Sequence, residues 1–296
     1  MRALVLGGTG MLGRQVVAEG RRRGHAALGL SRAQADVTDR GALLAWAREF
    51  RPEVVVNCAA MTAVDDCESQ EERAFAVNAA GVANAAAAAR AAGGRLVHVS
   101  TDYVFDGRAE TPYAEDAATA PLSVYGRSKL AGEEEALESS DGEALVVRTS
   151  WLFGPGGWNF VLNMLRQLAR GTDPLRVVDD QVGRPTYTPY LARSIWDLVA
   201  LGPARGAAGL VHYGNREPVS WYGFAREIVA SWKPAVQVAP VTTDVFPRPA
   251  TRPAYSVLAV DRFEALTGRP VESWRAGLGR YLDALRREPA FQQEKR

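Results

Sequence analysis

The chain has 296 residues, 47% of them hydrophobic and 23% charged, with a formal net charge of +1. This composition predicts a globular protein with one large domain or two unequal ones. A nearly neutral chain has no overall field that would attract nucleic acid or an anionic membrane. No apolar stretch approaches the roughly 20 residues of a membrane-spanning helix, and the apolar run at 3–6 is too short for a secretion signal. We therefore expect a cytoplasmic monomer or homodimer without a nucleic-acid or membrane partner.

The sequence contains neither a disulfide framework nor a zinc motif. Its two cysteines, Cys58 and Cys67, have no CxxC or Cys/His spacing around them, so reduced thiols are expected. An acidic cluster, Asp65, Asp66 and Glu68, precedes a helical pattern, where carboxylates favour the positive helix end. We prefer that interpretation to a metal site, and we predict no metal.

The first half of the chain alternates short apolar runs with helical patterns. Such alternation predicts an α/β fold, a doubly wound parallel sheet with helices on both faces. The expected strands are 3–6, 25–30, 54–58, 95–99 and 144–148, and the expected helices are 11–23, 39–50, 71–92 and 122–138.

A glycine-rich string, GGTGMLG at 7–13, follows the first strand and opens the first helix. With either Gly7 or Gly8 as the first glycine, the spacing fits a dinucleotide-binding loop of the Rossmann type. Gly10 would let the backbone approach a pyrophosphate, and Gly13 would let helix and strand pack closely. The amides of the next helical turn would face the phosphates at the positive helix end.

The second strand ends in Ser31 and Arg32, where a ribose-binding acid is expected. A hydroxyl and a guanidinium suit a 2′-phosphate instead, which favours NADPH and leaves NADH as an alternative. An ordinary surface arginine would look the same. Asp36 could accept a hydrogen bond from the adenine amino group, or it could cap the next helix.

Polar residues stand at the ends of the third and fourth strands, at the sheet edge where ligands of such folds bind. Small residues at 57–60 leave room for a cofactor, and hydroxyls at 100–101 could reach a substrate carbonyl. His98, inside the fourth strand, is interpreted as a packed core histidine. Asn78 lies in an apolar helix face and either holds the fourth-strand backbone or caps locally.

Tyr125 and Lys129 are four residues apart in the pattern of a single helix, so they share one face. A lysine at that spacing would stabilise a phenolate and lower the tyrosine pKa toward the working range. By itself the pair could arise by chance on an exposed helix.

After Trp151 the alternation breaks down. Helices are expected at 160–170, 190–201, 219–232 and 273–287, with a short strand at 210–213 that could return to the main sheet. We expect a dinucleotide-binding domain at 1–153, rejoined by about 188–215, and a smaller C-terminal substrate-binding domain at 154–187 and 216–296. The proline-rich string at 240–255 predicts a long loop, and loops of this length are usually functional or mobile.

Taken together, the glycine loop, NCAA, STDYVFDG and YGRSK resemble the extended short-chain dehydrogenase/reductase family. The strings AAMTAVDDCE, PLSVYGRSKLAGE, VVRTSWLFGPGGWNFV and QVGRPT are similar to its dTDP-4-dehydrorhamnose reductases, over essentially the whole chain. The resemblance implies NADPH-dependent reduction of the 4-keto group of dTDP-4-dehydro-6-deoxy-L-mannose to dTDP-L-rhamnose. A reductase of another nucleotide-linked 4-keto-deoxysugar, or a non-catalytic NADP-binding regulatory subunit, would share this pattern.

The resemblance also implies residue roles. Tyr125 would protonate the sugar oxygen, Lys129 would hold the nicotinamide ribose, and Thr101 would hydrogen-bond the carbonyl. Gln15 stands where some relatives carry an acid for a divalent ion. The expected substrate-binding residues are Thr101, Asp102, Tyr103, Phe105, Tyr125 and Trp151. The expected cofactor-binding residues are Gly7, Gly10, Met11, Leu12, Ser31, Arg32, Asp36, Val37, Ala59, Ala60, Met61, Thr62, Asn78, Ser100, Tyr125 and Lys129.

Overall fold

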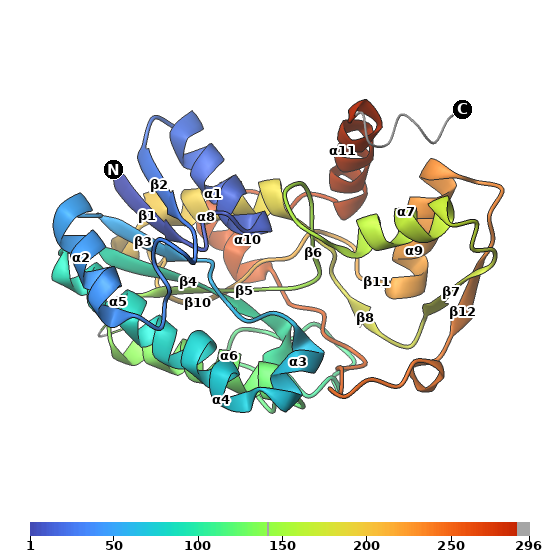
Figure 1. Ribbon diagram of the computed structural model, residues 1–296, viewed down its shortest axis with the longest axis horizontal. Coiled ribbons are helices and arrows are strands. Elements are labelled where there is room, and N and C mark those ends of the chain that lie inside the picture. Colours follow the sequence, from blue (N-terminus) through green and yellow to red (C-terminus); the bar gives the residue numbers. More distant parts are fainter. Residues whose placement is uncertain (141, 289–296) are drawn as a thin grey trace.

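A six-stranded, fully parallel sheet forms the centre of the larger part of the fold, with five strands from residues 2–149 and a sixth from residues 209–212 (Figure 1). The computed structural model describes residues 1–140 and 142–288. In order across the sheet the strands are β10 (Gly209–His212), β5 (Leu145–Thr149), β4 (Arg95–Thr101), β3 (Val54–Asn57), β1 (Arg2–Leu6) and β2 (Ala26–Leu30). The predicted doubly wound α/β fold is confirmed.

Helices cover both faces of this sheet because its strands present apolar side chains to both. Ala3 and Val5 of β1 belong to one core cluster, whereas Leu4 and Leu6 belong to another. The first cluster is shared with α1 (Met11–Arg22), α8 (Thr188–Leu201) and α10 (Asp261–Thr267). The second is shared with α2 (Arg40–Phe50), α5 (Gly81–Ala91) and α6 (Val124–Glu138).

The chain returns to this sheet after residue 187. Strand β10 pairs in parallel with β5, as the sequence predicts for 210–213. Helix α8 packs on α1, where the Trp196 indole N–H donates to the Val16 carbonyl at 2.8 Å. Residues Val260, Phe263 and Val271, later in the chain, also join the core on this face.

The helix predicted over 71–92 is interrupted. Helix α4 (Glu71–Phe75) passes into a π-helical turn, Ala76–Ala80, before α5 begins, and a separate short helix, α3 (Val64–Ser69), precedes it. Such wide turns often occur at functional sites. Here the turn carries Asn78, whose side chain bonds outside the helix.

The rest of the chain forms a smaller group of elements around a third core cluster, which includes Phe153, Phe224 and Trp274. Its helices are α7 (Phe160–Ala169), α9 (Trp221–Trp232) and α11 (Trp274–Arg287). The strand pairs are β7 (Leu175–Val178) with β12 (Val238–Val241), β8 (Val182–Gly183) with β11 (Val219–Ser220), and β6 (Leu152–Phe153) with β9 (Thr186–Tyr187). Most of the strands in these three pairs have two residues, which is too short for an alternating pattern to show in the sequence.

Elsewhere in the described chain and in this group, single 3₁₀ turns occur at Asp102–Val104, Pro203–Arg205 and Thr243–Val245.

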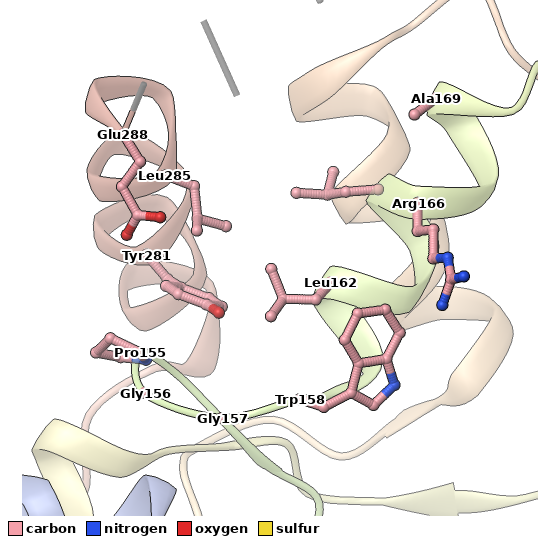
Figure 2. Close-up of a pocket in the computed structure, with 11 residues that line it drawn as sticks. Pro155, Gly156, Gly157, Trp158, Leu162, Arg166, Ala169, Tyr281, Leu285 and Glu288 are labelled. Atoms are coloured by element: carbon pink, nitrogen blue, oxygen red, sulfur yellow. The ribbon is translucent and has the colours of Figure 1, made fainter. Parts of the chain in front are cut away.

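An apolar groove of about 400 Å³ separates α7 from α11. Figure 2 shows Leu162 of α7 and Tyr281 and Leu285 of α11 facing each other across it, with Trp158 at the rim. None of the predicted site residues lines this groove. Among residues 1–140 and 142–288, no helix is both long and apolar enough to cross a membrane.

Candidate active site

The glycine loop after β1 has the backbone geometry that its sequence predicts. Gly7 has φ +67°, in the left-handed region that favours glycine. A Cβ on Gly13 would lie 2.2 Å from the Gly7 carbonyl oxygen, so helix α1 and the loop pack closely only without a side chain there. Met11 and Leu12 form the first turn of α1, where amide groups have no acceptor within the helix. These amides can bind phosphate oxygens.

A cavity of about 340 Å³ opens beside this loop. Many of the residues around it follow the ends of β1, β2 and β3. The cavity therefore lies where the strand order of the sheet reverses, which is where dinucleotides bind in such folds. It is lined by Gly7, Thr9, Gly10, Arg32, Ala35, Asp36, Val37, Cys58, Ala59, Ala60, Met61, Arg73 and Val77. The glycine loop leaves room for the backbone to approach a ligand, since side chains at Gly7 and Gly13 would meet neighbouring backbone atoms. Together with Arg32 and Arg73, this loop fits a dinucleotide that carries an extra phosphate.

Arg32 and Arg73 supply the positive charge of this cavity. The Arg32 guanidinium donates to the Asp36 carboxylate at 2.9 Å. The Thr38 backbone N–H, with further help from Arg32, lowers the pKa of Asp36. Asp39, not Asp36, caps the next helix by accepting from the Ala42 amide. No local pattern points to Arg73, because it reaches the cavity of Arg32 only through the packing of α4 beside the loop after β3.

Eight of the predicted cofactor residues do not line this cavity: Met11, Leu12, Ser31, Thr62, Asn78, Ser100, Tyr125 and Lys129. The Ser31 hydroxyl donates to the Gln34 side chain at 2.8 Å, and Thr62 is exposed. Asn78 does not hold the β4 backbone, so that interpretation was wrong. Its Oδ1 accepts from the Met61 amide at 2.8 Å, and its Nδ2 donates to the Met61 carbonyl at 3.1 Å. Asn78 thus fixes the loop after β3, which lines the cavity.

Tyr125 and Lys129 lie on the buried face of α6, beside the end of β4. Helix α6 begins after Ser123, whose hydroxyl accepts from the Gly126 amide at 3.1 Å. This cap sets the start of the helix and therefore which face carries the pair. The Lys129 side-chain nitrogen lies 2.7 Å from the Val99 carbonyl oxygen and 3.2 Å from His98 Nε2. Both Tyr125 and Lys129 are buried.

Burial controls the pKa values of this pair. It raises the pKa of Tyr125 above its ordinary value, and the hydrogen bond with Thr101 opposes that rise only in part. The Lys129 nitrogen is bonded to the Val99 carbonyl of β4. The lowered tyrosine pKa expected from the sequence is therefore not seen here. Burial also lowers the pKa of Lys129 to about 8.

The end of β4 places further polar groups next to Tyr125. The Thr101 hydroxyl donates to Asp102 Oδ1 at 3.1 Å and accepts from the Tyr103 amide at 3.2 Å. Asp102 is buried, and burial raises its pKa to about 6 although hydrogen bonds with Ser256 and Thr101 oppose the rise. The Tyr103 ring packs edge-on against Tyr125, with centroids 5.4 Å apart.

Not every polar or aromatic residue near this edge faces the site. The Ser100 hydroxyl donates to Glu133 at 2.5 Å, within a buried group that also contains Arg148. Phe105 has no exposed surface and stacks on Tyr113, with centroids 4.1 Å apart. Ser100 is therefore held in a buried polar group and Phe105 in an aromatic stack.

Tyr103 also lines a second cavity, of about 680 Å³. Arg176, Arg248 and Arg252 line it. Arg252 makes a two-pronged ion pair with Asp65, at 3.0 and 2.9 Å, which ties the proline-rich loop to the first turn of α3. The other lining residues are Tyr103, Phe160, Asn163, Met164, Gln167, Val177, Val178, Gln181, Trp221, Thr243, Asp244, Phe246, Pro247, Ala250 and Thr251.

Trp151 adopts an unusual backbone conformation for a bulky residue, with φ +48°. Its indole stacks on Trp221, with centroids 3.5 Å apart and planes 5° from parallel. Because Trp221 lines the second cavity, this stack forms part of the cavity's supporting wall. Strained backbone is maintained where the surrounding structure requires it, often at functional sites.

Comparison with known proteins identifies the family. The family model described as "RmlD substrate binding domain" matches residues 1–287. The chain belongs to this family. The dTDP-4-dehydrorhamnose reductase of Streptomyces griseus is 45% identical over 96% of this chain and 94% of its own length.

Solved structures agree with this membership. A dTDP-4-dehydrorhamnose reductase from Clostridium acetobutylicum has a TM-score of 0.91 at 39% identity, covering 97% of this chain and all of its own. The Bacillus anthracis enzyme, solved in complex with NADP, has a TM-score of 0.89 at 34% identity, covering 96% of this chain and 99% of its own. Within the described part of the present chain, no group of three or more His, Cys, Asp or Glu residues could hold a metal ion.

Proposed function

We propose that this protein uses NADPH to reduce the 4-keto group of dTDP-4-dehydro-6-deoxy-L-mannose, giving dTDP-L-rhamnose. One observation carries this proposal. Met61 and Tyr103 both pack against the cluster that contains Tyr125. Met61 lines the cavity beside the glycine loop, and Tyr103 lines the cavity with three arginines. A phenol whose neighbours line both the cavity beside the glycine loop and the arginine-containing cavity suits proton transfer to a substrate that receives a hydride.

The bound nicotinamide would supply the hydride to the ketone carbon. Negative charge then develops on the ketone oxygen, and the hydroxyls of Thr101 and Tyr125 would stabilise it by hydrogen bonds. Tyr125, kept protonated by its raised pKa, would deliver its proton to that oxygen. Lys129 would hold the ribose hydroxyls and return a proton to the tyrosinate.

Arg32 and Arg73 support NADPH as the cofactor, since guanidinium groups bind phosphate through paired N–H donors. The NADP complex of the Bacillus anthracis relative supports the same choice. We propose that Gly7, Gly10, Met11, Leu12, Val37, Ala59, Ala60 and Met61 contact this cofactor.

The three arginines of the second cavity support a diphosphate-linked sugar as the substrate. We propose that residues 1–153 and about 188–215 hold the cofactor. The sugar nucleotide would then be bound by 154–187 and by the chain from 216 to the last described residue. The C-terminal residues 289–296 of the predicted second domain lie outside the described structure. The cytoplasmic location and the monomeric or dimeric state stay predictions.

The test is an assay with the 4-keto-sugar nucleotide made in situ, following NADPH oxidation and identifying the sugar product. We expect dTDP-L-rhamnose, and we expect Tyr125→Phe to lower kcat by roughly 100-fold or more. Tyr222→Phe, on the half-buried face of α9, is the control and should leave kcat unchanged. A different epimer as product would reassign the substrate, and full activity of Tyr125→Phe would remove Tyr125 from the mechanism.

A further inference from the structure

A row of buried polar side chains extends from Lys129 away from Tyr125. His98, with no exposed surface, has Nε2 at 3.2 Å from the Lys129 nitrogen. On its other side, His98 Nδ1 lies 3.3 Å from Asn57 Nδ2. Asn57 is also fully buried and stands at the end of β3, directly before the loop that lines the cofactor cavity. The row therefore connects Lys129 to that loop.

The orientation of the Asn57 amide follows from its other contact. Asn57 Oδ1 accepts from the Ala59 backbone N–H at 3.1 Å. The opposite orientation would set the amide NH₂ group against that N–H, donor against donor. Asn57 Nδ2 is consequently the atom that faces His98, and it can only donate.

The histidine must then carry its proton on the far nitrogen. A fully buried imidazole without a carboxylate partner is held neutral, and the pKa of His98 is well below its ordinary value. A neutral imidazole has one N–H and one acceptor nitrogen. Since Nδ1 accepts from Asn57, Nε2 carries the proton and points at Lys129.

We propose that Asn57 fixes His98 as the Nε2–H tautomer, so that His98 donates to Lys129 and stabilises its neutral amine. An ammonium at this position would place donor against donor across 3.2 Å. A neutral amine can accept from His98 while donating to the Val99 carbonyl at 2.7 Å. Asn57 and His98 are positioning residues in this arrangement, because they act through Lys129.

One of the other groups facing Lys129 acts in the opposite direction. Glu133, on the next turn of α6, favours the ammonium, but burial outweighs it. Cys58 adds no charge near neutral pH, because burial raises the pKa of its thiol to about 12. Glu133 is itself paired with Arg148 of β5 at 2.6 Å, which weakens its influence. The pKa of Lys129, lowered to about 8, places both of its protonation states within reach near neutral pH.

The consequence for turnover rests on the proposed function. When Tyr125 gives its O–H proton to the ketone oxygen, a tyrosinate is left. The Lys129 ammonium then returns a proton to it, directly or through a ribose hydroxyl, and becomes an amine. The His98 Nε2–H stabilises that amine until Lys129 takes a proton from solvent. His98 itself neither gains nor loses a proton.

The tautomer can be measured without any assay of activity. Long-range ¹H–¹⁵N correlation spectra of protein labelled in its histidine rings distinguish the two nitrogens. The chain has three histidines, so the His98 signals are those lost in His98→Gln and kept in His25→Gln. We expect a protonated-type Nε2 and an unprotonated Nδ1. The reverse pattern, or a doubly protonated ring, would overturn the proposal whether or not the protein reduces the sugar.

The link to Lys129 is tested with Asn57→Leu, which removes the donor to Nδ1 without adding charge. His98 should then move its proton to Nδ1 and accept from the Lys129 ammonium. The apparent pKa of the basic limb of the kcat pH profile should rise by about one to two units, which is the size expected for one charge-assisted hydrogen bond. A reversed tautomer with an unmoved limb would refute the coupling. If Asn57→Leu does not fold, the wild-type spectrum alone still decides the tautomer.

Discussion

The buried ion pair between Arg148 and Glu133 makes a sharp prediction about stability. Arg148 donates to both carboxylate oxygens, at 2.8 and 2.6 Å, and each side chain is only 3% exposed. Ser100, one residue before Thr101, donates to the same carboxylate. The pair therefore helps to hold the end of β4, through the hydrogen bond from Ser100 to Glu133. Glu133→Gln leaves the arginine charge buried without a counter-charge.

The cost should be large because arginine cannot lose its proton. Breaking one side of a buried pair costs about 3–5 kcal/mol. For a chain of this size each kcal/mol shifts Tm by about 2–4 °C, so Glu133→Gln should lower Tm by about 6–20 °C. Arg148→Met should cost less, since the Glu133 carboxyl left behind can neutralise itself by binding a proton.

Thermal unfolding of Glu133→Gln, Arg148→Met and the double variant at pH 7 tests this reasoning. The double variant should be more stable than Glu133→Gln, because it buries no unpaired charge. Glu134→Gln changes an exposed neighbour on the same helix and should leave Tm unchanged. A Glu133→Gln protein that melts within about 2 °C of wild type would show that water reaches Arg148, and the account would fail.

Three further predictions concern the site. Arg32→Ala should lower the preference for NADPH over NADH in kcat/KM by roughly tenfold, one charge-assisted contact to phosphate, with kcat/KM for NADH kept; a lower value for both cofactors would indicate a structural role. Trp151→Ala should raise KM for the sugar nucleotide by roughly tenfold without changing NADPH affinity, with Trp158→Ala as the control; a lower Tm with unchanged KM would make Trp151 a packing residue. Because burial raises the pKa of Asp102 from 3.8 to about 6, the folded protein binds that proton more tightly than the unfolded chain. The Asp102 contribution to the unfolding free energy should then be lost as pH rises through about 6. Urea unfolding of wild type relative to Asp102→Asn should show a fall of about 2–3 kcal/mol between pH 4 and 8, and a pH-independent difference would contradict the buried carboxyl.

The amino-acid sequence could predict features that depend on neighbours along the chain. The alternation of short apolar runs with helical patterns predicted the parallel sheet, because a strand that is buried on both faces is a continuous run of apolar residues. Gly7 and Gly13 follow from backbone conformation and close packing, which exclude side chains locally. The spacing of Tyr125 and Lys129 guarantees a shared helix face.

Tertiary structure decided the contacts that join distant segments. Asn78 bonds Met61, Arg252 pairs with Asp65 far along the chain, and Trp151 stacks on Trp221. No local pattern encodes such partners, since each depends on how whole elements pack. The direction of the Tyr125 pKa shift was missed for the same reason: spacing places Lys129 on the right face, but burial and the Val99 carbonyl determine where its charge acts. A sequence specifies which groups are available, whereas desolvation and the angles between packed elements decide which of them meet.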